Sequence, residues 1–204
     1  MISEIKLKQC IDNCNFAGDI KRDLKEYNQA AIMVIFLLSE NDSEEKIIVI
    51  KRKNNLRQHA GQIAFPGGKI EKKDKSLMET AFRETQEEIN IFKKDLEVLG
   101  YLPFFYTGTG YAVRPYIAFL KNSIDFENKI TPCFTEVEKI FIVEAKKLLS
   151  PLNHKRIKAP KNSKMEMTWK VEYENENIWG LTARILVTIS AGLNLREFPP
   201  CDDI

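Results

Sequence analysis

The chain has 204 residues, of which 44% are hydrophobic and 29% are charged, and this composition is typical of a globular protein that buries a sizeable core. Intrinsic disorder and fibrous architectures are excluded, and the length predicts a single domain over residues 1–204. Lys and Arg total 31 against 29 Asp and Glu, a formal charge of +2, so no global field favours nucleic acid or a membrane as a partner.

Neither a membrane span nor an export signal is expected. The longest apolar run, at residues 30–38, is about half of the ~20 residues that a bilayer-crossing helix needs. The N-terminus mixes acidic and basic residues and lacks the apolar stretch of a secretory signal. The four cysteines are too sparse for a disulfide scaffold, although Cys10 and Cys14 could share one face of a helix. We therefore expect a cytoplasmic protein with reduced, inert thiols.

The predicted elements are a mixture of strands and helices. An N-terminal helical segment at residues 1–28 precedes strands at 30–38 and 46–51, which a polar loop joins as a hairpin. Residues 52–68 are loop-like and end in Phe65-Pro66-Gly67-Gly68, where paired glycines permit backbone conformations closed to other residues. Further strands are expected at 96–102, 113–120, 139–143 and 165–173, with a short helix at 144–149 and a closing helix at 178–195. This order predicts an α/β protein in which a mixed sheet lies between helices.

A helix is predicted from Ser76 onwards, because four apolar-facing positions recur at four-residue spacing: Leu77, Ala81, Thr85 and Ile89. Asp74 or Ser76 is suited to cap the N-terminus of this helix, and Asn90 is suited to the left-handed conformation that ends it.

Three carboxylates crowd the last turn of that helix: Glu84, Glu87 and Glu88. On a solvated helix each like-charge neighbour at this spacing costs ~0.2–0.5 kcal/mol, and acids at a C-terminus also oppose the helix dipole. A divalent cation would reverse both penalties, and the Gly67-Gly68 turn could bring a carbonyl oxygen to the same ion. The alternative is a solvated acidic face that is eased by Arg83, one turn before Glu87.

Residues 68–91 resemble the signature of the Nudix hydrolases, G-x5-E-x7-R-E-U-x-E-E-x-G-U, where U is aliphatic. This chain reads G-x5-D-x8-R-E-T-x-E-E-x-N-I. The resemblance implies the Nudix fold, an α/β/α arrangement. It also implies metal binding by three acids and one backbone carbonyl, and an arginine that braces the helix: Glu84, Glu87, Glu88, Gly68 and Arg83.

The chain departs from the signature at four points. Asp74 replaces a glutamate, one extra residue precedes Arg83, Thr85 replaces an aliphatic residue, and Asn90 replaces a glycine. None of these changes removes a metal ligand. In the family the glutamate at this position braces the loop. Because Asp74 has a shorter side chain, the residue type alone does not assign that role to Asp74.

A second segment, at residues 52–68, resembles the motif of the coenzyme A pyrophosphatase branch, R-x4-R-x3-G-x3-F-P-G-G. Its fixed positions are all present and assign substrate binding to Arg52, Arg57, Gly61, Phe65 and Gly67. Shorter matches of the same branch occur at residues 110–115, 136–137 and 179–182. Guanidinium groups bind phosphate oxygens in a bidentate manner, which suits this role. The alternative is that Arg52 is an ordinary surface charge at a strand end.

The resemblance implies that Mg²⁺ or Mn²⁺ assists water in cleaving the pyrophosphate of coenzyme A or acyl-CoA. The base that accepts the proton is left open between Glu84 and Glu136, with His59 as a third candidate. Two other hypotheses remain: hydrolysis of another nucleoside diphosphate derivative, such as ADP-ribose or a nucleotide sugar, and a non-catalytic binding module. All three take a small molecule as the partner. The segment before Ala30 is open to two interpretations, a lid or a contact in a homodimer.

Overall fold

The computed structural model of the chain describes residues 2–17, 22–37, 44–55, 60–120, 129–159 and 166–199. Its main sheet has the strand order β3-β2-β1-β7-β5, with β4 also paired to β1, β6 to β7 and β8 to β2. The strands are β1 (Asn28–Leu37), β2 (Lys46–Arg52), β3 (Ile63–Ala64), β4 (Gly67–Lys69), β5 (Leu96–Tyr101), β6 (Phe105–Tyr106), β7 (Tyr111–Leu120) and β8 (Val137–Glu144). The sheet is mixed, because β1 and β7 are parallel and the other pairs are antiparallel.

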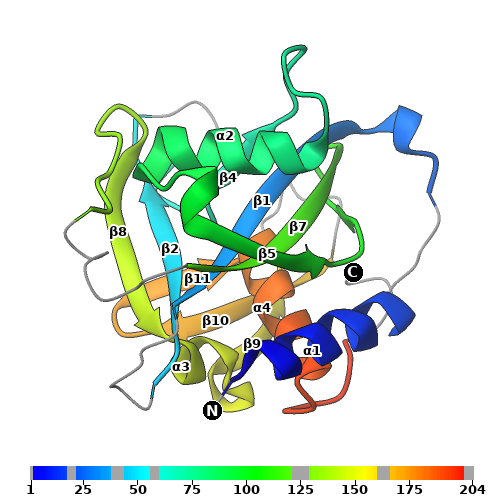
Figure 1. Cartoon of the computed structure of the whole chain (residues 1–204). Helices are drawn as coiled ribbons and strands as arrows, with labels where there is room; N and C mark the ends of the chain where they lie inside the picture. Colours follow the sequence, from blue (N-terminus) through cyan, green and yellow to red (C-terminus); the bar gives the residue numbers. More distant parts are fainter. Residues whose placement is uncertain are drawn as a thin grey trace.

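Helices cover both faces of this sheet (Figure 1). Helix α2 (Leu77–Ile89) packs on one face through Ala81 and Ile89, opposite Ala31, Met33 and Ile35 of β1. The other face packs on α1 (Glu4–Ala17), α3 (Ala145–Leu149) and α4 (Leu181–Gly192). The predicted α/β/α arrangement is therefore confirmed. Within the described residues, no helix is long and apolar enough to cross a bilayer.

Helix α2 begins and ends as its sequence predicts. The Ser76 Oγ accepts a hydrogen bond from the Glu79 amide at 3.2 Å, so Ser76 rather than Asp74 is the N-cap. Asn90 ends the helix in the left-handed conformation, with φ 60° and ψ 29°. Ala81, Thr85 and Ile89 are fully buried, which confirms the predicted packing stripe.

A second, three-stranded sheet was not expected from the sequence. It has the order β11-β10-β9 and consists of β9 (His154–Lys158), β10 (Met167–Tyr173) and β11 (Glu176–Trp179). The closing helix was predicted from residue 178, but Ile178 and Trp179 belong to β11. Gly180, with φ 68°, turns the chain before α4 begins at Leu181. The predicted helical segment at 1–28 contains the helix α1, which ends at Ala17, and a short 3-10 helix at Leu24–Glu26, and its last residue already belongs to β1.

Candidate active site

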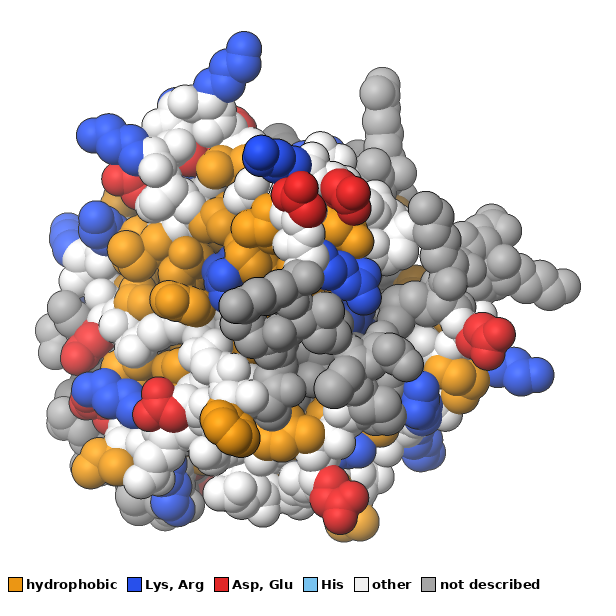
Figure 2. All heavy atoms as spheres, turned by 90° about the vertical axis from the view of Figure 1, so that its right-hand side faces the viewer, with side chains coloured by type: hydrophobic (Ala, Val, Ile, Leu, Met, Phe, Trp, Pro, Cys, Tyr) orange, Lys and Arg blue, Asp and Glu red, His pale blue; other side chains and the backbone are white. Residues whose placement is uncertain are grey.

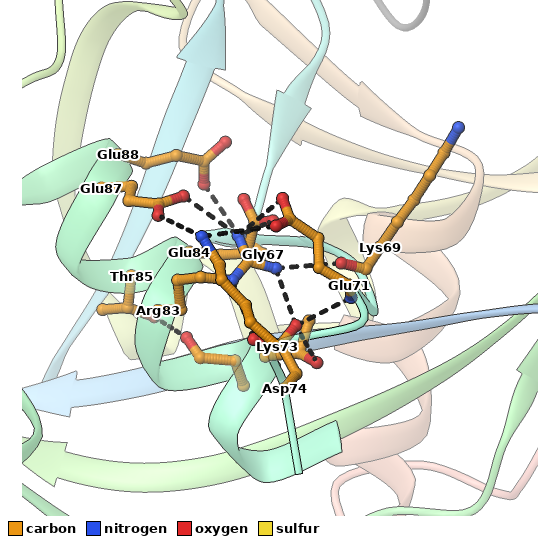
Figure 3. A network of polar contacts seen from close by, with 12 residues as sticks. Gly67, Lys69, Glu71, Lys73, Asp74, Arg83, Glu84, Thr85, Glu87 and Glu88 are labelled. Atoms are coloured by element: carbon orange, nitrogen blue, oxygen red, sulfur yellow. Dashed lines mark hydrogen bonds and ion pairs between the residues drawn. The ribbon is translucent and has the colours of Figure 1, made fainter. Parts of the chain in front are cut away.

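Arg83 of α2 lies at the centre of a polar network (Figure 3). Its Nη1 donates to Glu84 Oε1 at 2.7 Å and to Glu87 Oε2 at 3.0 Å. Its Nη2 donates to the Lys69 carbonyl at 3.0 Å. The guanidinium therefore joins the helix to the strand that follows the Gly67-Gly68 turn, a contact of the kind that the resemblance to the Nudix signature implies.

Asp74 holds Arg83 from the opposite side. Its Oδ1 accepts from Arg83 Nε and its Oδ2 from Arg83 Nη2, both at 3.0 Å. Oδ2 also accepts from the Glu71 amide and from the Thr80 hydroxyl, each at 2.9 Å. These hydrogen bonds, that from Arg83 above all, hold the pKa of Asp74 well below its usual range. The shorter side chain thus still braces the loop, a role that residue type alone did not assign.

Glu84 lies against the glycine turn. A Cβ added to Gly68 would come within 2.5 Å of the Glu84 carboxylate, so only glycine leaves room for this side chain. The Glu84 side chain is 15% exposed, and its burial raises its pKa, opposed by the hydrogen bond from Arg83. The carboxylate is therefore held beside a backbone segment and is less acidic than a solvated glutamate.

Glu88 is the buried member of the three acids. Only 2% of its side chain is exposed, with Oε1 accepting from Arg52 Nη1 at 2.8 Å and Oε2 from the Gly67 amide at 2.9 Å. Burial raises the pKa of Glu88 to about 7, although the Gly67 amide and the charge of Arg52 oppose the shift. The contact joins the upstream motif to the Nudix-like segment, across 36 positions of sequence.

Glu87 and Glu136 lie in more open surroundings. The Glu87 side chain is 52% exposed, whereas Glu136 lies in an exposed turn that directly precedes β8. Two backbone hydrogen bonds of 2.9 Å fix this turn, from the Cys133 amide to the Glu88 carbonyl and from the Lys53 amide to the Glu136 carbonyl. Glu136 is close enough to raise the pKa of Glu84 and Glu88 by charge repulsion. The sequence gives no signal for the Cys133 contact, since it depends on the path of a loop.

Some residues of the upstream motif, at 52–68, lie at the site, and others pack in the core. Gly67, with φ 151°, passes so close to β1 that a Cβ would lie 2.3 Å from the Ala31 carbonyl, which explains the need for glycine. Phe65 is 3% exposed and packs in the core, and Gly61 turns the chain with φ 67° beside Asn54. Two further sequence candidates, Arg57 and His59, lie outside the described residues.

The donor set fits a hard divalent cation. Glu84, Glu87 and Glu88 offer only carboxylate oxygens, and the cradle at Gly68 keeps its backbone beside Glu84. Among the described residues, however, the side chains form no ready group of three or more acidic, His or Cys ligands. Arg83 holds Glu84 and Glu87, whereas Arg52 holds Glu88. The acids are therefore not bare, and repulsion between them does not by itself require a cation.

A hollow of the described surface lies away from these residues. It has a volume of about 420 Å³ and is lined mainly by apolar side chains of α2, β5 and β7, among them Met78, Phe82, Val98, Tyr101 and Tyr116. Hydrophobic side chains also gather on this side of the molecule in Figure 2. None of the described candidate site residues lines this hollow. The site is instead built at the end of β2, the glycine turn and the last turns of α2.

Comparisons with known proteins show the family to which the chain belongs. The NUDIX domain model matches residues 27–163. The chain is 32% identical over 163 residues to a protein of Photorhabdus laumondii named as an uncharacterized Nudix hydrolase NudL, a match that covers 80% of this chain and 84% of that relative. A protein of the same name from Yersinia pestis is 35% identical over 146 residues, or 70% of each chain.

Among solved structures, a MutT/nudix family protein from Enterococcus faecalis has a similar fold, with a TM-score of 0.52 at 13% identity over 93% of this chain and 73% of that chain. The match of the domain model to most of the chain, together with these relatives, identifies the family. The chain belongs to the Nudix hydrolases.

Proposed function

We propose that this Nudix hydrolase cleaves the pyrophosphate bond of coenzyme A or acyl-CoA. Water is added across the P–O–P linkage, and the products are 3′,5′-ADP and 4′-phosphopantetheine or its acylated form. Nudix hydrolases in general use divalent metal ions. Here we assign the metal to Glu84, Glu87, Glu88 and the Gly68 carbonyl, and we assign phosphate binding to Arg52 and Arg57.

The hydrogen bond between Arg52 Nη1 and Glu88 Oε1, at 2.8 Å, is the observation that carries this proposal. Arg52 is the first residue of the upstream motif, and Glu88 is the last acid of the Nudix-like segment. Their contact, together with that of the Gly67 amide, supports a single site in which the substrate-specific motif lies against the catalytic helix. An ordinary surface charge would instead lie in solvent, whereas the Arg52 side chain is 21% exposed.

In this proposal the residues around Glu84 have separate roles. Arg83, fixed by Asp74, keeps Glu84 and Glu87 oriented on α2. Glu84 or Glu136 accepts the proton of the attacking water. Burial raises the pKa of Glu84, which makes its carboxylate a better proton acceptor than a solvated one. A bound Mg²⁺ or Mn²⁺ would polarise the water and neutralise charge on the phosphates.

The test is product analysis with purified protein. Coenzyme A, dephospho-coenzyme A, ADP-ribose and NADH are incubated separately with Mg²⁺ or Mn²⁺, and the products are identified by mass spectrometry. The proposal predicts fastest turnover on coenzyme A or an acyl-CoA. Faster turnover on ADP-ribose would replace it by the nucleoside diphosphate hypothesis, and no turnover on any substrate would favour a binding module.

A further inference from the structure

Arg52 stands where the proposed substrate and metal sites meet. It is the last residue of β2, at a point where the pairing with β8 shifts register. Its amide donates to the Gln62 carbonyl at 3.0 Å, and its carbonyl accepts from the Gly61 amide at 3.1 Å. Its backbone is thus fixed by the returning loop. From this fixed backbone its side chain reaches Glu88.

Glu88 has both carboxylate oxygens occupied. Arg52 holds Oε1 at 2.8 Å, and the Gly67 amide holds Oε2 at 2.9 Å. Within the described part of the chain, Arg52 is the only cationic side chain in an ion pair with this carboxylate, which is 2% exposed. When this buried carboxylate is ionised, Arg52 therefore supplies its counter-charge in the metal-free protein.

A divalent cation at Glu88 would compete with that guanidinium. Both positive groups would lie within a few ångströms of the same small carboxylate, where repulsion between them is strong. Removal of the cation would in turn leave Glu88 buried without a counter-charge unless Arg52 returned. One positive group can therefore replace the other at this carboxylate.

We infer that Arg52 is an internal counter-ion of the metal site, which a divalent cation displaces from Glu88 and which is then released towards a substrate phosphate. This inference rests on the proposed function, because it uses the metal assignment of Glu88. Arg52 then couples the binding of the metal to the binding of the substrate phosphate. Metal binding then raises the affinity for an anionic ligand, and the anion raises the affinity for the metal by the same factor.

The test measures Mn²⁺ affinity without substrate, from the electron paramagnetic resonance signal of free Mn²⁺. We compare the wild-type chain with Arg52→Gln, Arg52→Lys and the control Lys53→Gln. Lys53 carries the same charge on the next residue, but the two partners of the Glu88 carboxylate are Arg52 and Gly67. Loss of a competitor predicts that Arg52→Gln binds Mn²⁺ about tenfold more tightly than Lys53→Gln, within the usual range of coupling between sites.

Arg52→Lys keeps a competing charge, so its affinity should fall between those of the wild type and Arg52→Gln. Thermal denaturation shows whether Arg52→Gln folds. If it does not, Arg52→Lys alone tests the inference, and weaker Mn²⁺ binding by Arg52→Lys than by the wild type would overturn it. If the wild type binds Mn²⁺ and Arg52→Gln and Lys53→Gln bind it with equal affinity, the inference about Arg52 is overturned, but the proposed metal site is not. A wild-type chain that binds no Mn²⁺ would overturn the proposed metal site as well.

Discussion

The brace between Asp74 and Arg83 gives the sharpest prediction about stability. The Asp74 side chain is 4% exposed and accepts four hydrogen bonds, two of them from Arg83. In Asp74→Asn the amide oxygen can serve the three donors at Oδ2, but the amide nitrogen then faces Arg83 Nε, which is also a donor. One charge-assisted hydrogen bond is lost, and Arg83 loses a counter-ion.

The expected cost follows from these contacts. A hydrogen bond to a charged group contributes about 1.5–3 kcal/mol, and Arg83 retains Glu84 and Glu87 as partners, so we expect a loss of about 2 kcal/mol. For a chain of this length, that corresponds to a Tm decrease of about 4–8 °C. Thermal unfolding followed by circular dichroism measures it.

Glu71→Gln is the matched control. Glu71 approaches the same guanidinium at 3.6 Å but is 52% exposed, so its removal should cost less than about 0.5 kcal/mol. Because the pKa of Asp74 is lowered by folding, its stabilisation is present above the ordinary value of 3.8 and is lost as the pH falls below it. Equal Tm decreases in Asp74→Asn and Glu71→Gln would refute the bracing role. So would a difference in Tm between the two variants that grows as the pH is lowered.

Four further outcomes are expected. Gly68→Ala should lower kcat about 100-fold with little change in Tm, because its Cβ would displace the flexible end of Glu84 rather than the backbone; unchanged kcat would contradict the cradle. Glu87→Gln should abolish turnover on every substrate, and retained activity would count against its metal role. Arg57→Ala should raise the KM for coenzyme A more than that for dephospho-coenzyme A, whereas equal effects would argue against recognition of the 3′-phosphate. Burial lowers the pKa of His154 below 6.5, so the unfolded chain takes up the proton first and stability should fall on acidification through that pH; His154→Gln should flatten this dependence between about pH 7.5 and about pH 5.5, as measured by Tm.

Local sequence patterns predicted the site helix well. The cap at Ser76, the stripe from Ala81 to Ile89 and the left-handed Asn90 all depend on neighbouring residues and are confirmed. The predicted start of the closing helix was wrong, because the apolar residues Ile178 and Trp179 precede Gly180 and resemble a continuation of the helix, whereas they belong to β11.

Local sequence patterns did not predict contacts between residues that are distant in the sequence. The pairing of Arg52 with Glu88 depends on how β2 and α2 pack, and the repulsion argument overlooked it for that reason. Of the two contacts that Arg83 makes with acids of α2, helical spacing predicts the one with Glu87. The contact with Glu84 was not predicted. The second sheet was missed because its first strand, His154–Lys158, is mostly basic and lacks an apolar alternation.

The central claim is that these acids bind a divalent cation, and a crystal grown with Mn²⁺ tests it most directly. The account predicts an anomalous peak within coordination distance of Glu84, Glu87 and Glu88, with the Gly68 carbonyl nearby. Absence of a peak, with Glu87 still bound to Arg83 and Glu88 still bound to Arg52, would contradict it.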